Sequence, residues 1–442
     1  MNIKLPDGAQ YIITVLEENG YEAYVVGGCV RDAVLGGEPK DWDICTSALP
    51  EQTMKCFDGQ RIIETGLKHG TITVMVCHRP FEVTTYRVDR KYKDNRRPEK
   101  VEFVNVLKRD LARRDFTINA MAYNPKTGLV DYYGGRQDLA ERKIKCVGNA
   151  DKRFQEDALR IMRALRLASA LGFSIDETTS EAVFRNRGLL RNISVERFAA
   201  ELNKLIVGGA EDVLLKYSPV IEEIIPEIKD MIGFRQNNPY HHLDVWTHTV
   251  KSVVNAPVNP VLRLTMLLHD IAKPNCFTED GNLVGHFYGH PKISADMASE
   301  ILKRLKYDNG TIEMVVELVL HHDADVLPRR KHIKRWLNRI GETRLRQLLE
   351  VKRADAMAQS ETYRQAKLDV LEEIPPIIDE IIEQRQCFSL KDLAVNGRDL
   401  IGIGVPEGVE IGKALKVLLG LVIDEVVEND KAKLLNVAKK AI

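Results

Sequence analysis

The spacing of apolar residues separates a first part with short alternating segments from a longer part with helical periodicity. In the first part, runs rich in β-branched and aromatic residues lie between Gly, Pro and Asp turns, which is typical of strands. Two of these runs flank His78-Arg79-Pro80 and predict a hairpin. The predicted strands are residues 21–26, 41–45, 71–77, 81–86, 101–104 and 129–133. This pattern predicts a small mixed sheet with helices, up to about residue 140.

Beyond that point, apolar residues recur every three to four positions, which predicts helices. One predicted helix covers 151–171, with Gly172 as its C-terminal cap. Another covers 192–206, with Ser194 placed to cap its N-terminus. We therefore expect the α+β fold class, with a mixed-sheet head followed by helical parts. The expected divisions are a head over 1–140, a neck over 141–210, a histidine-rich domain over 240–360 and a helical tail over 361–442.

Composition limits the classes of protein to which the chain can belong. Its 442 residues exceed one hydrophobic core, so two to four domains are expected. The 64 basic and 64 acidic side chains cancel, so a nucleic-acid surface would have to be local. The seven cysteines form no Cys-x-x-Cys pair, which is typical of free thiols in a reducing compartment. Without a signal-peptide core or a membrane-length apolar run, we expect a cytoplasmic protein with no membrane partner.

Two carboxylates, Asp41 and Asp43, follow closely after a Gly27-Gly28 turn. On a strand, side chains two positions apart point the same way, so both could bind the same divalent cations. The glycines let backbone N–H groups approach a phosphate, and Arg31 in the next helix can pair with a triphosphate. Metals held by carboxylates beside a phosphate cradle suit in-line attack on a nucleoside triphosphate. A lone Asp-x-Asp is common on protein surfaces. The preceding Gly-Gly-x-Val-Arg-Asp segment is what favours a metal site over an ordinary surface pair.

Four motifs then occur in a characteristic order. They lie at residues 27–43, 110–120, 131–139 and 156–160. They resemble the head, second, hinge and base-reading motifs of class II tRNA nucleotidyltransferases and bacterial poly(A) polymerases, in the DNA polymerase β-like superfamily. The resemblance covers about the first 200 residues. It implies a nucleotidyltransferase head, Mg²⁺ as cofactor, and CTP, ATP and tRNA as partners.

The base-reading motif contains Asp157 and Arg160, whose spacing predicts one shared helix face. A carboxylate accepts from an exocyclic amine, and a guanidinium donates to ring nitrogens or carbonyls. The pair could therefore read cytosine or adenine without a template, as the resemblance implies. Arg163 and Arg166 continue the stripe at a spacing that suits phosphates. The alternative is a solvated helix with charges paired at i and i+3.

The second motif adds expectations that rest on resemblance. Arg114 matches the family's triphosphate contact, alongside Gly28 and Arg31, and Asp115 is expected to position Arg114. Asn119 is expected to hold a turn of the fold.

Three further features of the head have open or family-based interpretations. Glu82 is either a third acidic group near the metals or an edge-strand charge. The basic segment 86–100 resembles a mobile segment that the family needs for the last nucleotide. Residues 65–72 resemble the tRNA-type version of their stretch, which favours CCA addition. A poly(A) polymerase or an A-only enzyme is the alternative.

Eight of the eleven histidines lie between residues 241 and 322. His248, His269-Asp270 and Asp355 occur in the order of an HD phosphohydrolase domain, which the region resembles. Imidazole and carboxylate ligands from separate helices suit a second divalent metal, and Asp323 could replace Asp355. The further ligands considered are His286, His290, His321 and His322. An HD phosphohydrolase whose head only binds RNA is therefore the alternative from another functional class.

A basic run at 329–335 follows this region. It could contact an RNA backbone or simply begin a solvated helix after Pro328.

Overall fold

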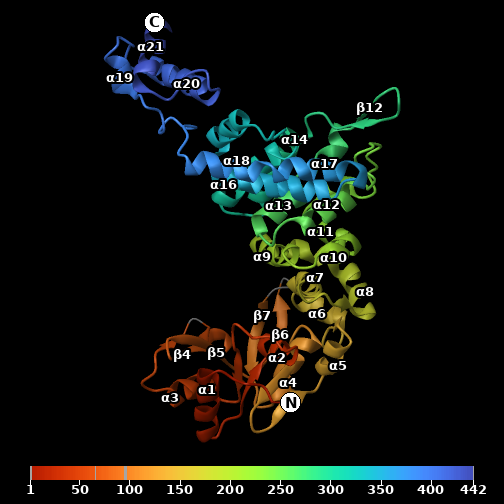
Figure 1. Cartoon of the computed structure of the whole chain (residues 1–442). Coiled ribbons are helices and arrows are strands. Elements are labelled where there is room, and N and C mark those ends of the chain that lie inside the picture. The colour runs from red at the N-terminus through yellow and green to blue at the C-terminus, as the bar shows by residue number, and fades with distance from the viewer. Residues whose placement is uncertain (1, 65, 94–96, 442) are drawn as a thin grey trace. The chain divides into compact units, whose positions relative to one another are not determined.

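The computed structural model describes residues 2–64, 66–93 and 97–441 (Figure 1). The chain divides into two compact units, Met1–Pro226 and Glu227–Ile442. This boundary falls between the predicted neck and the predicted histidine-rich domain, and the finer division into four parts stays a prediction. Within the described part of the chain, no helix is both long and apolar enough to span a membrane.

A mixed seven-stranded sheet forms the core of the first unit. Its strands are β1 (Ala23–Val26), β2 (Ile44–Thr46), β3 (Ile62–Ile63), β4 (Thr71–Val76), β5 (Arg79–Thr85), β8 (Met121–Asn124) and β9 (Gly128–Asp131). The strand order is β3-β4-β5-β2-β1-β8-β9, and only the β2–β5 pair is parallel. The predicted α+β class with a mixed sheet is therefore confirmed.

The predicted hairpin is present, with its turn one position earlier than expected. Arg79 and Pro80 already belong to β5, opposite Val76 and Met75. The turn residues Cys77 and His78 both have positive φ, 50° and 61°. Two consecutive positive φ angles are characteristic of the tight turns whose twist matches that of paired strands.

Helices and a separate ribbon surround this sheet. The helix α1 (Asp7–Glu18) packs on β1, β2 and β5 and buries Ile12, Ile13 and Leu16. The other helices of this part are α2 (Gly28–Val34), α3 (Pro50–Cys56), α4 (Leu107–Ala112) and α5 (Gly135–Ala140). The strands β6 (Arg87–Lys93) and β7 (Arg97–Phe103) pair antiparallel outside the main sheet. Residues 94–96, within the predicted functional segment 86–100, lie outside the described residues.

The single helix predicted over 151–171 is wrong, because the chain breaks at Asp157. The helix α6 (Ala150–Glu156) ends there, and α7 (Leu159–Leu171) begins two residues later. Asp157 is extended, with φ −142° and ψ 104°, and its Oδ1 accepts a hydrogen bond from Leu159 N at 3.1 Å. A side chain that satisfies the first backbone donors of a helix favours a new start over continuation. Gly172 caps α7 as expected, with φ 62°.

The neck continues with short elements around α7. They are β10 (Lys143–Ile144), β11 (Ser174–Ile175), α8 (Glu177–Asn186), α9 (Val195–Ile206), α10 (Glu211–Lys216) and α11 (Ser218–Ile221). The helix predicted over 192–206 begins only at Val195, so Ser194 does occupy the N-cap position, but its side chain accepts no capping hydrogen bond from the described residues. The helix is held instead by its buried face, which includes Phe198, Leu202 and Leu205.

The second unit is almost entirely helical, as expected. Its elements are α12 (Val245–Asn255), α13 (Pro260–Leu268), β12 (Thr278–Glu279), β13 (Gly285–His286), α14 (His290–Arg304), α15 (Asn309–His321), α16 (Arg330–Met357), α17 (Glu361–Glu372), α18 (Ile374–Glu383), α19 (Gly397–Ile401), α20 (Val409–Ile423) and α21 (Lys431–Ala441). Side chains of Asp244, Asn259 and Asp308 accept capping hydrogen bonds at α12, α13 and α15. These caps fix where the apolar helices begin, and so where their histidines lie.

The basic run 329–335 begins α16 and is used within the unit. Arg330 pairs with Glu380 at 2.5 Å, and Arg335 pairs with Asp424 at 2.6 Å. Lys334 lies 3.8 Å from Glu425. The structure therefore favours the helix-start interpretation over a surface for RNA.

Candidate functional site

The paired acids of the head lie at the entrance to β2. The strand begins only at Ile44, so the strand predicted from residue 41 is shorter than expected. Asp43 is nevertheless extended along β1, because its carbonyl oxygen accepts a hydrogen bond from Val26 N at 3.0 Å. Asp41 and Asp43 are both exposed. Both carboxylates therefore remain accessible to ligands from solution.

The parallel pairing of β2 with β5 brings a third acid to this place. Ile44 is paired with Val83 in these parallel strands, and Asp43 and Glu82 are the residues just before them. Asp43 and Glu82 therefore lie next to each other on neighbouring strands. Although Asp43 is exposed, the surrounding protein removes part of its hydration and raises its pKa. The Arg114 guanidinium lowers that pKa, and the Glu82 and Asp41 carboxylates raise it further. Glu82 thus lies close enough to act on Asp43, which favours its interpretation as part of the acidic site.

A glycine turn and one arginine lie next to these acids. Gly27 has a φ of 87°, and a Cβ at this position would lie 2.8 Å from Arg114 Nη1. Any side chain there would be strained and would displace the guanidinium. Gly28 is the first residue of α2. The predicted residues Gly28 and Arg114 are therefore neighbours of the same turn, and Gly27 is the position where only glycine fits.

Arg31 is fixed by a chain of polar contacts that reaches the neck. Its Nε donates to Asp32 Oδ1 at 2.8 Å, and its Nη1 donates to Asn119 Oδ1 at 2.8 Å. Asn119 Nδ2 donates to Asp115 Oδ1 at 3.2 Å, and Arg163 Nε donates to Asp115 Oδ2 at 2.7 Å. Asn119 thus links Arg31 to Asp115. It also lies in the short turn Thr117–Asn119, as expected.

The expectation that Asp115 positions Arg114 is wrong, since Asp115 pairs with Arg163. Burial opposes the charge on Asp115, but Arg163 and the hydrogen bond from Asn119 outweigh burial and lower its pKa to about 2. Arg114 instead lies 3.7 Å from Asp110. The sequence could not reveal that Asp115 pairs with Arg163 and not with Arg114, because Arg163 lies on a helix 48 residues away.

The base-reading pair does not share a helix face, because of the break at Asp157. The Asp157 carboxylate is held from α9, where Arg197 Nη2 lies 3.1 Å from Oδ2. Arg160, the second residue of α7, donates to Glu156 Oε2 at 2.7 Å and to the Arg153 carbonyl at 3.1 Å. Each member of the predicted pair is therefore fixed by its own partner.

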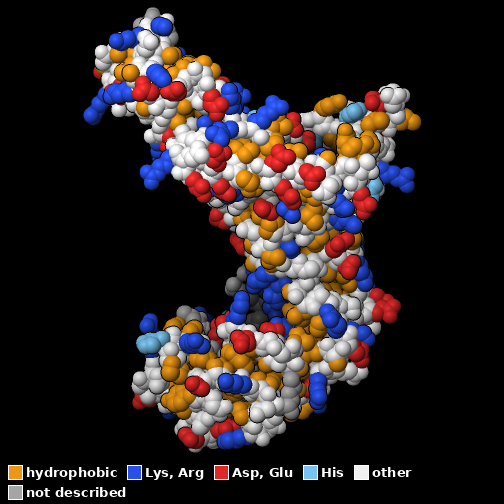
Figure 2. All heavy atoms as spheres, in the orientation of Figure 1, with side chains coloured by type: hydrophobic (Ala, Val, Ile, Leu, Met, Phe, Trp, Pro, Cys, Tyr) orange, Lys and Arg blue, Asp and Glu red, His pale blue; other side chains and the backbone are white. Residues whose placement is uncertain are grey.

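The remaining arginines of the stripe lie along α7 as predicted. Arg163 pairs with Asp115, and Arg166 Nε lies 3.1 Å from Glu201 Oε2 on α9. Figure 2 shows Lys and Arg side chains gathered in a hollow of the first unit, between the strands and the neck helices. A local basic surface therefore exists despite the zero net charge of the chain.

A second group of polar residues converges inside the second unit. His248 Nε2 lies 2.9 Å from Asp355 Oδ1 and 3.5 Å from Asp270 Oδ2. His269 Nε2 lies 3.1 Å from Asp270 Oδ2 and 3.7 Å from Asp355 Oδ1. The structure thus brings together all four residues singled out from the sequence. Asp355, and not its competitor Asp323, makes these contacts.

Two more histidines face the other oxygen of Asp270. His290 Nε2 and His322 Nε2 lie 3.4 and 3.5 Å from Asp270 Oδ1. Two groups of three ligands, each within 4.8 Å, therefore share Asp270. We call the six residues the His/Asp cluster: His248, His269, Asp270, His290, His322 and Asp355.

Two histidines that were considered from the sequence have partners other than the carboxylates of the cluster, although His286 lines the same cavity as Asp270. His321 packs its ring edge-on against Trp336, with centroids 5.2 Å apart. His286 pairs with Asp280 at 3.2 Å and stacks on Tyr288.

The four histidines of the cluster are oriented in the same way. Each uses Nδ1 against a backbone carbonyl and turns Nε2 towards the carboxylates. The acceptors are the carbonyls of Ala358 at 3.3 Å, Met266 at 2.7 Å, Phe287 at 2.8 Å and Val319 at 2.7 Å. A ring whose Nδ1–H donates to a carbonyl presents Nε2 as a free acceptor, which is the arrangement of metal-ligating histidines. The donor set therefore fits divalent metal ions.

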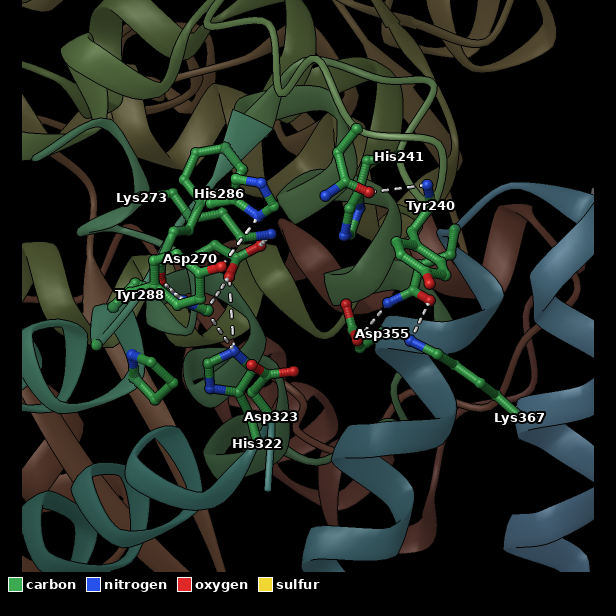
Figure 3. Close-up of a pocket in the computed structure, with 16 residues that line it drawn as sticks. Tyr240, His241, Asp270, Lys273, His286, Tyr288, His322, Asp323, Asp355 and Lys367 are labelled. Carbon is green, nitrogen blue, oxygen red and sulfur yellow. Dashed lines mark hydrogen bonds and ion pairs between the residues drawn. The ribbon is translucent and has the colours of Figure 1, made fainter. Parts of the chain in front are cut away.

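The electrostatics of the cluster agree with a cation site. Burial opposes a charge on His269, but the Asp270 and Asp355 carboxylates outweigh burial and raise the pKa of His269 to about 10. Lys273 Nζ lies 2.7 Å from Asp270 Oδ2 and donates to Gln236 Oε1 at 2.9 Å. We did not anticipate Lys273 from the sequence, although it lies one helical turn after Asp270. Figure 3 shows Asp270, Lys273, His322 and Asp355 around a cavity of about 470 Å³, which these four residues help to line.

Comparisons with known proteins identify the class first. A family model described as "Poly A polymerase head domain" matches residues 23–145. A second, "Probable RNA and SrmB- binding site of polymerase A", matches residues 172–232. A third, "tRNA nucleotidyltransferase domain 2 putative", matches residues 286–438. The first of these contains Asp41, Asp43 and Arg114, so the head is that of a nucleotidyltransferase.

Relatives similar over nearly the full length identify the family. The CCA-adding enzyme of Geobacillus kaustophilus is 33% identical, over 96% of this chain and 94% of the relative. That of Limosilactobacillus reuteri is 34% identical, over 97% of this chain and 94% of the relative. The chain belongs to the family of CCA-adding enzymes.

Solved structures agree with this assignment. A Bacillus stearothermophilus CCA-adding enzyme in complex with CTP is 29% identical, with a TM-score of 0.74, over 98% of this chain and 96% of that one. A Thermotoga maritima CCA-adding enzyme complexed with tRNA-CCA is 19% identical, with a TM-score of 0.62, over 98% of this chain and 95% of that one. The second likeness is one of fold.

Proposed function

We propose that the chain adds CCA to the 3′ end of tRNA from CTP and ATP, by metal-dependent nucleotidyl transfer at Asp41 and Asp43. One observation carries the location of the reaction. The pairing of β2 with β5 gathers Asp43, Asp41 and Glu82 beside Arg114, which itself lies against the Gly27 turn. The hollow where basic side chains gather provides a surface for the tRNA end (Figure 2). A cytoplasmic location, where tRNA is processed, is part of this proposal.

The acidic residues fit Mg²⁺ as the cofactor. Mg²⁺ prefers hard oxygen ligands and is commonly bound by one or two carboxylates together with substrate phosphates. Asp41 and Asp43 would hold the metal, and Glu82 would add negative charge beside them. When bound, two such ions activate the attacking 3′-hydroxyl and stabilise the departing pyrophosphate.

The basic side chains nearby would hold the triphosphate. Arg114 lies between the acids and the Gly27-Gly28 turn, so it can neutralise phosphate oxygens there. Arg31 is pre-oriented by Asp32 and Asn119, which reduces the conformational entropy lost on binding.

Selection between the two nucleotides would fall to Asp157 and Arg160. Arg197 and Glu156 fix these two side chains independently. A carboxylate and a guanidinium held in this way can complement cytosine or adenine by hydrogen bonds. Arg163 and Arg166, further along α7, would contact phosphates of the nucleotide or of the tRNA.

The test is incubation of the protein with tRNA lacking its 3′ CCA, Mg²⁺ and each nucleotide separately and together. We expect two C residues from CTP alone, and one further A when ATP is also present. A long A tail would identify a poly(A) polymerase, and A addition only to tRNA already ending in CC would identify an A-only enzyme. Either product would overturn the proposal.

A second function is favoured by the His/Asp cluster. Its imidazole and carboxylate donors fit a transition metal such as Mn²⁺, Ni²⁺ or Co²⁺ better than Mg²⁺ alone. His248, His269, Asp270 and Asp355 would hold one ion, and Asp270, His290 and His322 a second. Such ions, when bound, supply an activated water for hydrolysis of phosphoesters. We therefore propose that the second unit is a metal-dependent phosphohydrolase of the HD type.

The phosphohydrolase is tested by metal analysis and by hydrolysis of bis(p-nitrophenyl) phosphate in Mn²⁺ or Ni²⁺. We expect bound metal and released nitrophenol, with the metal content reduced and the nitrophenol release lost in His269→Ala. A purified protein that binds no metal at micromolar concentrations would refute the metal site itself.

A further inference from the structure

One acid of the head is fully buried behind the exposed acids of the proposed nucleotidyl-transfer site. Asp110 lies on α4, and its side chain is 0% exposed. Its neighbours on α4, Leu107 and Leu111, belong to one apolar cluster with Cys45 and Tyr86. A buried carboxylate is costly unless charged partners and hydrogen bonds compensate it. The partners of Asp110 therefore indicate what this acid does.

The two carboxylate oxygens of Asp110 have different partners. Oδ1 accepts hydrogen bonds from Arg113 Nε at 2.9 Å and from Arg87 N at 3.2 Å, and Arg113 Nη2 also lies 2.9 Å from it. These contacts fix the carboxylate between the end of α4 and the first residue of β6. Oδ2 accepts no hydrogen bond from the described residues and lies 3.7 Å from Arg114 Nη2. Arg113 thus orients the carboxylate, and Oδ2 is left to face Arg114.

Arg114 lies between this buried acid and the acids at the entrance to β2. Its Nη1 lies 2.8 Å from the place that a Cβ would take at Gly27, and its charge acts on Asp43. Among the described residues, Asp110 supplies the only carboxylate within ion-pair distance of the Arg114 guanidinium. Asp110 therefore attracts Arg114 from the side opposite to Asp43.

Without Asp110, the attraction on Arg114 would come from one side only. Asp41, Asp43 and Glu82 are exposed, and their charges are screened by water. Coulomb attraction is stronger in buried surroundings, so one buried carboxylate can balance several exposed ones. A guanidinium that moved onto Asp43 would be lost to the phosphates of a nucleotide and would compete with metal ions for that carboxylate.

We propose that Asp110 is a positioning residue, whose Oδ2 holds Arg114 where this arginine can bind the triphosphate. The inference rests on the proposed nucleotidyl transfer and names the residue that keeps its phosphate contact in place. Asp110 itself touches neither the nucleotide nor the metal. Its effect on phosphate affinity therefore passes through Arg114.

The first test is the affinity of the full chain for CTP with Mg²⁺, measured by calorimetry without tRNA, so that nothing is extended. Asp110→Asn keeps the shape of the side chain and removes its charge. We expect the Kd for CTP to rise about tenfold, because a displaced guanidinium loses a charge-assisted hydrogen bond to phosphate. An unchanged Kd in an Asp110→Asn protein that is folded by circular dichroism would overturn the inference.

Glu223→Gln is the matched control in the same unit. Glu223 is also a carboxylate shared by two arginines, with Arg187 at 3.1 Å and Arg191 at 2.9 Å. The chemical change is the same as in Asp110→Asn, but it falls on the neck, away from α4 and β2. The Kd for CTP should stay at the value of the unchanged protein, and a rise equal to that of Asp110→Asn would overturn the inference.

A double-mutant cycle separates positioning from a merely structural role, in which Asp110 only joins α4 to β6. If Asp110 acts through Arg114, Asp110→Asn should change the Kd for CTP less than about twofold in Arg114→Ala protein. Equal losses with and without Arg114 would overturn the inference. Should Asp110→Asn not fold, Asp110→Glu, which moves the carboxylate and keeps its charge, enters the same cycle with the same two outcomes.

Inorganic pyrophosphate, which has no base, identifies the part of the nucleotide concerned. Its Kd should rise in Asp110→Asn by the same factor as the Kd for CTP. Weaker binding of CTP with unchanged binding of pyrophosphate would place the effect at the base and overturn the inference. These measurements need no tRNA, so they are independent of activity. Failure of the unchanged protein to extend tRNA would refute the proposed function, whereas additive losses in the cycle would refute only the role of Asp110.

Discussion

The acidic site of the head and the His/Asp cluster, both proposed here to bind divalent metals, are built in opposite ways. Asp41 and Asp43 are exposed at the entrance to a strand, whereas His248 and His269 are each 0% exposed. An exposed pair of carboxylates leaves coordination positions for substrate phosphates. A buried set of imidazoles and carboxylates supplies most ligands itself. If both proposals hold, we expect metal and substrate to bind together in the head, whereas the ligands of the cluster are already in place before substrate binds.

The most severe test of this comparison removes both acids of the head. For Asp41→Ala with Asp43→Ala, we expect nucleotide incorporation into tRNA to fall about a thousandfold or more, because metal stabilisation of the transferring phosphoryl group is worth several kcal/mol. Hydrolysis of phosphoesters should survive. Gel analysis of extended tRNA measures the first activity, and phosphate release measures the second.

Asp58→Ala, an exposed acid of the same unit, is the control for this variant. Incorporation that persists in the double variant would show that the metals are held elsewhere.

A second test separates two adjacent histidines of α15 and its C-terminal cap. His322→Ala removes a ligand of the cluster, and we expect affinity for Mn²⁺ to fall about 10–100-fold. His321→Ala should leave metal content unchanged, because His321 packs against Trp336 instead. Elemental analysis gives the metal content. Excess Mn²⁺ should raise the unfolding temperature of His321→Ala more than that of His322→Ala, since only ligand bound to the native state stabilises it. Equal responses would count against the second group of ligands.

A third test measures how much the ion pair between Asp115 and Arg163 contributes to the stability of the first unit. For Asp115→Asn we expect a loss of about 2 kcal/mol in the free energy of unfolding at pH 7, from the shift of the pKa to about 2. The folded-state pKa lies below the unfolded value of about 3.9, so the folded state binds fewer protons in between. The stabilisation is therefore complete above about pH 4 and is lost as pH falls towards about 2. Urea unfolding between these values, with Asp58→Asn as control, measures it; a pH-independent difference would contradict the ion pair with Arg163.

The smallest effect is expected for nucleotide selection. Arg160→Ala should increase misincorporation about tenfold, because a lost hydrogen-bond donor weakens discrimination more than it weakens triphosphate binding. Arg185→Ala, on the exposed face of α8, is the control. Competition between CTP, ATP and UTP during tRNA extension measures the error rate. Equal error rates in Arg160→Ala and the unchanged protein would remove Arg160 from base selection.

Local patterns in the sequence were sufficient where neighbouring residues decide the structure. The hairpin, the cap at Gly172 and the mixed sheet follow from strand alternation and glycine placement. The break at Asp157 was missed because the apolar period continues through it. The carboxylate ends one helix and begins another, which a count of periodic positions does not detect.

Pairings between distant segments were beyond local patterns. The sequence identified His248, His269, Asp270 and Asp355 through their order, but not which further histidines join them. His321 and His322 are adjacent in sequence, but the helix turns their side chains in different directions. His321 packs against Trp336, whereas His322 faces Asp270, and only the structure shows which is which. Likewise, Arg163 replaces Arg114 as the partner of Asp115 because α7 packs beside the second motif.

The orientation of the four histidines in the cluster has a consequence for sequence drift. Each ring is held through Nδ1 by a main-chain carbonyl, which every amino acid possesses. Substitutions at Met266, Phe287, Val319 or Ala358 that preserve the backbone keep these four anchors. Distant homologues can therefore exchange the residues that orient the rings and still present the same four nitrogen atoms.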